Sequence, residues 1–200
     1  MQTRFMKRAV WGAMAVAAML AAGAAQAALQ DRDLNGDTVT DAFYDTDLNI
    51  TWLRDANVNG LMNWATAVGW ADTYSFGGYT DWRLPTSDTC VNMNCTGSEM
   101  GHLWYSELGN SAGQMTDTGD FQNLQSNLYW SGLRFAPDPD LVWIFSTRDG
   151  NQGHASKSAA LYAMAVRPGD VAAAIPEPET YALMLAGLAA LALARRQQRR

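Results

Sequence analysis

The sequence predicts an α+β fold for the central part of the chain, residues 28–175. Three observations support this class: an early pair of strand-like segments, two segments with helical periodicity, and a final series of strand-like segments. Strands and helices are grouped along the chain instead of alternating, which argues against βαβ winding of a parallel sheet. About 150 residues are enough for one domain that buries about 70% of its unfolded surface.

The first strands are expected to form a hairpin. Residues 43–45 and 50–53 are rich in aromatic and β-branched side chains, and the polar segment 46–49 between them is typical of a turn. The preceding residues, 28–41, are polar and acid-rich, so we expect a loop or an extended arm there.

Two helices are expected next. In the first, which should end before Gly77, apolar residues recur at spacings of three and four: Leu61, Trp64, Ala65, Val68 and Ala71. The second has a capping-box arrangement, with Thr96 three residues before Glu99, and a stop signal at Gly109. Its predicted apolar face consists of Met100, Leu103, Trp104 and Leu108.

The sequence of the last part of the domain predicts a series of antiparallel strands. Segments 128–131, 141–146 and 162–167 contain the aromatic and β-branched residues that strands favour. Turn-rich segments at 137–140 and 149–153 separate them. The complete prediction is therefore two helices with small antiparallel sheets.

The N-terminal residues have the pattern of a secretory signal peptide. Arg4, Lys7 and Arg8 precede an apolar region over residues 9–24, and small residues follow it. This pattern predicts cleavage by signal peptidase before Ala28, so residues 1–27 are not expected to belong to the fold.

The C-terminal tail, residues 176–200, combines three elements. Pro176, Glu177 and Pro178 precede 14 apolar residues at 181–194, and four of the last six residues are arginines. At about 1.5 Å per residue the apolar helix spans roughly 21 Å, short of a hydrocarbon core of about 30 Å, with its basic end expected in the cytoplasm. Such a segment suits a transient anchor in the inner membrane.

This order of elements resembles the PEP-CTERM sorting signal of Gram-negative bacteria. The resemblance implies that an exosortase reads and cuts the tail, and that the protein reaches the cell surface or the extracellular matrix. An ordinary C-terminal anchor is the alternative.

The charge of the central region argues against nucleic-acid binding. Residues 28–175 contain 18 acidic and seven basic residues, a net charge of −11, without a cluster of Lys or Arg. Such a surface repels phosphate backbones, whereas cations or cationic partners fit it better.

The two cysteines, Cys90 and Cys95, lie in the exported region and predict a disulfide. Two free thiols are the alternative. A zinc site that includes His102 is disfavoured because the local sequence offers no fourth ligand.

Five segments of the domain occur in the order found in a known family. They are Asp-Leu-Asn-Ile-Thr-Trp-Leu at 47–53, Asn-Trp-Ala at 63–65, Gly-Tyr-Thr-Asp-Trp-Arg-Leu-Pro at 78–85, Tyr-Trp-Ser at 129–131 and Ala-Val-Arg-Pro at 165–168. In these segments the chain resembles the DUF1566 family, also called the Lcl C-terminal domain family. The resemblance implies a C-type lectin-like domain, and the family's founding example is similar to a surface adhesin that binds sulfated polysaccharide.

Four residues within these segments are interpreted mainly as structural: Trp82, Arg83, Trp130 and Arg167. A buried Trp removes a large apolar area from water while its N–H seeks an acceptor. Each arginine is expected to form a bidentate pair with an acid such as Asp81 or Asp45. A role for these residues in ligand binding is the alternative.

The sequence gives no positive support for enzymatic activity. It contains no nucleophile elbow, His-Glu-x-x-His helix, Walker loop or dinucleotide fingerprint. His102 is interpreted as a packing or surface residue of the second helix, and His154 as a solvated residue.

One string resembles part of a calcium-binding loop. Asp31, Asp33, Asn35 and Asp37 alternate as in the first half of an EF-hand, but Ala42 stands where the bidentate Glu is needed. A solvated acidic arm is one interpretation, and a calcium site completed by another acid such as Asp41 is the other. No other cofactor is predicted.

The segment around Asp138 and Asp140 is interpreted as a rigid turn that could form the rim of a ligand site. These observations together predict an exported, non-enzymatic surface or matrix protein that binds carbohydrate or another extracellular partner. A structural component of the envelope or exopolysaccharide matrix is the alternative, and a polysaccharide-acting enzyme is a weaker one.

Overall fold

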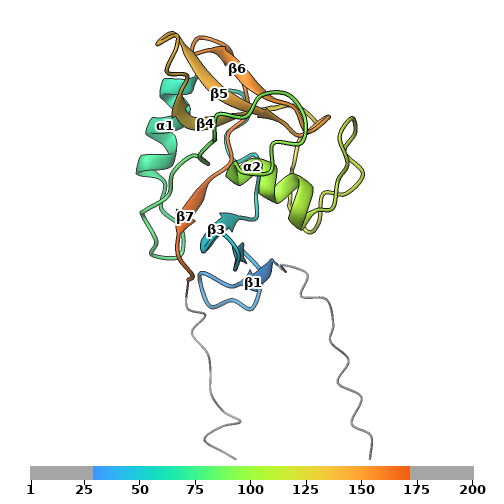
Figure 1. Cartoon of the computed structure of the whole chain (residues 1–200). Helices are drawn as coiled ribbons and strands as arrows, with labels where there is room; N and C mark the ends of the chain where they lie inside the picture. Colours follow the sequence, from blue (N-terminus) through green and yellow to red (C-terminus); the bar gives the residue numbers. More distant parts are fainter. Residues whose placement is uncertain (1–28, 172–200) are drawn as a thin grey trace, which may run out of the picture.

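Two small antiparallel sheets and two helical regions make up residues 29–171, the part of the chain that the computed structural model describes (Figure 1). The predicted α+β class, with two helices and small antiparallel sheets, is confirmed. The predicted signal peptide, the Pro176–Pro178 motif and the apolar tail lie outside the described residues.

The first sheet has four strands, in the order β1-β2-β3-β7. Its members are β1 (Gln30–Arg32), β2 (Ala42–Asp45), β3 (Ile50–Leu53) and β7 (Val166–Pro168). The predicted hairpin is β2 and β3, in which Phe43 pairs with Trp52. Part of the acidic segment, predicted as a loop or extended arm, forms β1 and pairs with β2.

The second sheet has three strands, in the order β4-β5-β6. It consists of β4 (Leu128–Arg134), β5 (Leu141–Ser146) and β6 (Gln152–Ser156). The prediction was wrong about its third member, because β6 begins inside the segment predicted as a turn. The segment 162–167 instead leads into β7, which pairs with β3 in the other sheet.

Helix α1 (Trp64–Thr73) begins at Asn63, whose side chain accepts a hydrogen bond from the Thr66 amide. Its small residues Ala67 and Ala71 are buried against the three-stranded sheet, in a cluster with Trp130, Val142 and Ile144. Leu61, which was predicted on the buried face, precedes the helix and is 55% exposed.

Helix α2 (Glu99–His102) continues directly into the π-helical segment η1 (Leu103–Glu107). The predicted cap was wrong: Ser98, not Thr96, caps α2 by accepting a hydrogen bond from the Gly101 amide. Ser98 is extended and stands next to the first helical residue, so its hydroxyl can reach that amide.

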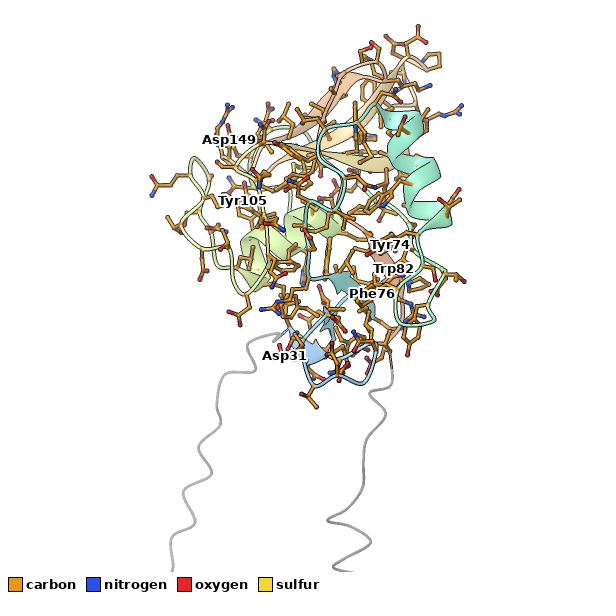
Figure 2. All side chains as sticks on the ribbon, turned by 180° about the vertical axis from the view of Figure 1, so that it is seen from behind. Asp31, Tyr74, Phe76, Trp82, Tyr105 and Asp149 are labelled. Atoms are coloured by element: carbon orange, nitrogen blue, oxygen red, sulfur yellow. A yellow bond between two sulfur atoms is a disulfide. The ribbon has the colours of Figure 1, made fainter. Side chains whose placement is uncertain are left out.

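Four tryptophans in the core are at most 2% exposed, and each donates its indole N–H to a protein acceptor. The acceptors are an Asp45 oxygen for Trp52 and the carbonyls of Tyr79 for Trp82, Thr147 for Trp104 and Met62 for Trp130. Trp82 and Trp130 are therefore core residues, as predicted. Figure 2 shows Trp82 together with Tyr74 and Phe76, with which it shares one apolar cluster.

The first and last described strands lie at the same end of the domain. Arg32 of β1 donates to Asp170, just after β7, over 2.6 Å. Figure 1 shows these strands at the end opposite the β4-β5-β6 sheet. Within residues 29–171, no helix has the length and apolarity needed to cross a membrane.

Candidate functional site

The disulfide loop lies against the edge of the three-stranded sheet. Cys90 and Cys95 are bonded, with their Cα atoms 5.5 Å apart, which confirms the prediction. Asn92 and Gln152 of β6 exchange two backbone hydrogen bonds of 2.8 Å. The Gln152 side chain also donates to the Asp88 carboxylate over 2.6 Å, so β6 and its buried glutamine hold the loop in place.

A cavity of about 410 Å³ opens between this loop and the connection from β4 to β5. Its apolar wall includes Phe135 and Trp143, whose rings meet edge to face with centroids 5.2 Å apart. Phe135 also lies 4.4 Å from the ring of His154, which was predicted to be a solvated residue and is exposed. Polar groups on the wall come from Ser87, Asp88, Thr89 and Arg134.

A smaller cavity of about 250 Å³ adjoins the first, because Leu133 lines both. It lies between α1 and β4, and its polar lining residues are Asp72, Arg83 and Thr86. Leu133 itself is 41% exposed. We call the two spaces together the Leu133 cavities.

Asp138 and Asp140, predicted as a ligand rim, lie in the turn between β4 and β5. The Asp138 carboxylate accepts a hydrogen bond of 2.9 Å from the Asp140 amide, so it stabilises the turn. Pro137 lines the larger cavity, but neither carboxylate does. Near these acids the cavity is lined by Phe135, Ala136 and Pro137.

The two motif arginines both form bidentate pairs. Arg167 donates to both oxygens of Asp81 over 2.7 and 3.0 Å, as predicted, and this bonding lowers the pKa of Asp81. Arg83 pairs with Glu99, not with Asp81 or Asp45, over two distances of 2.7 Å. Glu99 is the first residue of α2, and its carboxylate binds Arg83 instead of forming the predicted capping box.

The predicted calcium ligands are only partly brought together. The carboxylate of Asp33 accepts hydrogen bonds from the amides of Asn35, Gly36 and Thr38, which lower its pKa, with the Thr38 amide contributing most. Asp31 instead accepts from the Thr40 hydroxyl over 3.2 Å, and Figure 2 shows it at the β1 end of the domain.

The carboxylates that do approach one another belong to Asp33, Asp37 and Asp41, with one oxygen of each within 4.8 Å of the others. Burial raises the pKa of Asp41. Any calcium site in this arm would therefore use Asp41 and exclude Asp31.

A second cluster was not predicted. His102, interpreted from the sequence as a packing or surface residue, lies between the carboxylates of Asp45 and Glu107. Burial, assisted by the facing Asp45, raises the pKa of Glu107. The sequence carries no signal for this cluster, because residues five apart do not share a face of an ordinary α-helix.

Two family models match the chain. A model described as the Lcl C-terminal domain matches residues 41–167, and one described as the PEP-CTERM protein-sorting motif matches residues 174–200. No curated protein matches the sequence.

Proposed function

Since the chain belongs to the Lcl C-terminal domain family and ends in a PEP-CTERM sorting motif, we propose that it is a surface protein that binds carbohydrate in the Leu133 cavities. The sorting motif supports export and delivery to the surface or extracellular space by an exosortase. The proposed activity is binding without catalysis.

The observation that carries this proposal is the composition of the larger cavity. Its volume of about 410 Å³ falls in the range of roughly 300 to 1,000 Å³ typical of sites for small ligands. A sugar ring has an apolar C–H face and a polar rim of hydroxyls. Phe135 and Trp143 offer apolar surface to the face, while Asp88 and Arg134 offer an acceptor and donors to the rim.

The arrangement of the two cavities favours a chain over a single sugar. Leu133 lies at their common boundary, and each cavity has its own polar residues. A polysaccharide segment that spans both would bury the exposed part of Leu133. The extracellular location expected from the sorting motif brings the domain into contact with such polymers.

The charges near the cavities favour a neutral or weakly charged glycan. Arg83 is already paired with Glu99, which leaves Arg134 as the cavity-lining cation without a carboxylate partner in residues 29–171. Its guanidinium lies over the Trp64 ring, 5.5 Å from the centroid. Since residues 28–175 carry a net charge of −11, a densely sulfated polymer would be repelled.

The test is a glycan array probed with the full chain in detergent, followed by titration calorimetry on each hit. Leu133→Asp should weaken binding at least about tenfold, because it places a charge at the boundary between the cavities. Leu61→Asp is the matched control, since Leu61 is also an exposed leucine but lines neither cavity.

If no glycan on the array binds, the result would favour the alternative hypothesis that the protein is a structural component of the envelope or exopolysaccharide matrix. Equal weakening by both substitutions would place the binding surface elsewhere. Release of reducing ends from a bound polysaccharide would contradict the proposal that the domain only binds.

We also propose that the tail is removed during sorting. Fourteen apolar residues are short for a permanent anchor, so the mature protein should lack residues 195–200. Intact-mass measurement of surface material tests this, and recovery of the complete basic end would identify a plain anchor.

A further inference from the structure

Three side chains from separate elements meet at the end of β2 in the four-stranded sheet: Asp45, His102 and Glu107. Asp45 ends β2, His102 ends α2 and Glu107 ends η1. Nε2 of His102 lies 3.1 Å from Oε1 of Glu107 and 3.8 Å from Oδ2 of Asp45. The side chains of Asp45 and Glu107 are 0% and 1% exposed, and that of His102 is 15% exposed.

The π-helical turn is what brings two of these residues together. In a regular α-helix, residues five apart point in directions that differ by about 140°. Here the Leu108 amide donates to the Leu103 carbonyl over 2.9 Å, the five-residue bond of a π-helix. The wider turn lets His102 and Glu107 share one side. Such turns are frequent at functional sites.

The Asp45 carboxylate is held so that one oxygen faces the cluster. Its Oδ1 accepts hydrogen bonds from the amides of Asp47 and Leu48, over 3.1 and 2.9 Å. Its Oδ2 lies 3.4 Å from the indole nitrogen of Trp52 and points towards His102. Outer hydrogen bonds of this kind orient the ligands of metal sites.

With both carboxylates ionised, the charges of the cluster do not balance without a cation. Two buried carboxylates face one imidazole, and no Lys or Arg within the described part of the chain pairs with either acid. Even a protonated His102 leaves one buried negative charge, which is costly in an apolar interior. A divalent ion bound by two carboxylates and a neutral imidazole would leave no net charge.

We propose that Asp45, His102 and Glu107 bind a zinc ion that fastens the four-stranded sheet to η1. One imidazole nitrogen and two carboxylate oxygens form a donor set that zinc accepts, with water as the fourth ligand. Ligand atoms of a tetrahedral zinc site lie about 3.4 Å apart, given bonds of about 2.1 Å. The distances of 3.1 and 3.8 Å from Nε2 bracket that value.

The site is separate from the Leu133 cavities, so its test does not depend on glycan binding. The full chain is stripped with a chelator and titrated with zinc chloride by calorimetry, and the visible spectrum is recorded after cobalt substitution. One zinc per chain should bind, with calcium and magnesium ions much weaker, because imidazole nitrogen favours zinc.

His102→Gln and Glu107→Gln keep the size and polarity of the side chains but remove a ligand or its charge. Each should weaken zinc binding more than about 100-fold, since even loss of an outer hydrogen bond costs roughly 10- to 100-fold. Asp45 is left intact because its carboxylate also holds the turn after β2. The chain has two histidines, so His154→Gln is the matched control and should bind as the unmodified protein does.

Circular dichroism of the stripped variants establishes that they are folded before binding is compared. Substoichiometric zinc binding by the folded, unmodified chain would overturn the proposal. So would equal affinity of His102→Gln and the unmodified chain, or loss of binding in His154→Gln alone.

Discussion

The two ends of the domain differ in how completely their charged groups are paired and their apolar groups are buried. At the four-stranded sheet, Arg32 and Arg167 each have a bidentate acid partner, and Trp82 is enclosed in an apolar cluster. At the three-stranded sheet, Leu133 is exposed, Arg134 has no acid partner among residues 29–171, and two cavities open. Apart from the cluster of Asp45, His102 and Glu107, the groups compared at the first end are paired or enclosed, whereas the second end leaves exposed groups at which we place the proposed ligand.

The substitution Trp82→Ala tests this difference between the two ends most directly. Truncating a fully buried aromatic residue typically costs about 3 to 5 kcal/mol, so the free energy of unfolding should fall by that amount. Phe135→Ala, at the other end, removes a half-buried ring and should cost less while weakening glycan binding. Urea unfolding of both variants measures the difference. A larger loss of stability for Phe135→Ala would reverse our assignment of the two ends.

Removing the disulfide should affect the three-stranded end alone. On the chain-entropy model so small a loop contributes roughly 2 kcal/mol, so the double substitution Cys90→Ser and Cys95→Ser should leave the domain folded. Thr89 and Val91 line the larger cavity, so glycan affinity should fall as the loop loosens. Hydrogen exchange should accelerate at residues 88–97 but not in β2 and β3. Uniform acceleration would show that the loop supports the whole domain.

The ion pair of Asp81 and Arg167 should make the four-stranded end sensitive to acid. Hydrogen bonding from Arg167 lowers the pKa of Asp81 below its ordinary value of 3.8. The pair therefore stabilises the fold fully above that value, and its contribution disappears as pH falls through the lower folded-state pKa. Because Asp81 is half exposed, the effect should be at most about 1 kcal/mol.

Asp81→Asn provides the comparison for this pH dependence. The unmodified chain should be more stable than the variant at pH 6, and the difference should shrink as the pH falls below 3.8 and through the lower folded-state pKa of Asp81. A constant difference across this range would mean that the Asp81 charge does not contribute. Guanidine is unsuitable for this measurement because it screens ion pairs, so urea is the denaturant.

Calcium should have the smallest effect. If Asp33, Asp37 and Asp41 hold the ion without a bidentate twelfth-position Glu, the dissociation constant should be about 10⁻⁴ to 10⁻³ M. Millimolar calcium would then raise the melting temperature slightly, and Asp37→Asn should abolish the rise. Asp31→Asn is the control, since Asp31 is not part of this cluster. Identical melting curves with and without calcium would leave the arm as a solvated loop.

The features predicted correctly from the sequence are those fixed by neighbouring residues. Strands β2 and β3 follow from aromatic and β-branched segments on either side of one turn, and the disulfide joins cysteines in one short loop. Helix α1 also follows from a local pattern, although Leu61 and Ala65 of its predicted apolar face are exposed and the buried Ala67 was not part of that face. In each case the information needed lies within about a dozen residues.

The errors come from pairings between distant segments. Strand β6 contains a glycine and polar residues of low strand propensity, and it becomes a strand because β5 pairs with it. Glu99 could not be assigned to Arg83 without knowing that α2 packs beside the segment after Trp82. The Leu133 cavities likewise need residues 87–91 and 133–137 to meet, which no local pattern encodes.

The contact between Arg32 and Asp170 holds the first and last described strands together at one end of the domain. Nine residues lie between Val171 and Tyr181, where the apolar run begins, and the ten Cα–Cα steps of a fully extended chain reach about 35 Å. If the tail inserts into the membrane as proposed, the β1 and β7 end of the domain would be held near the lipid surface. The sheet β4-β5-β6 lies at the opposite end (Figure 1). In such a precursor it would face away from the membrane, where the proposed glycan could bind before the tail is removed.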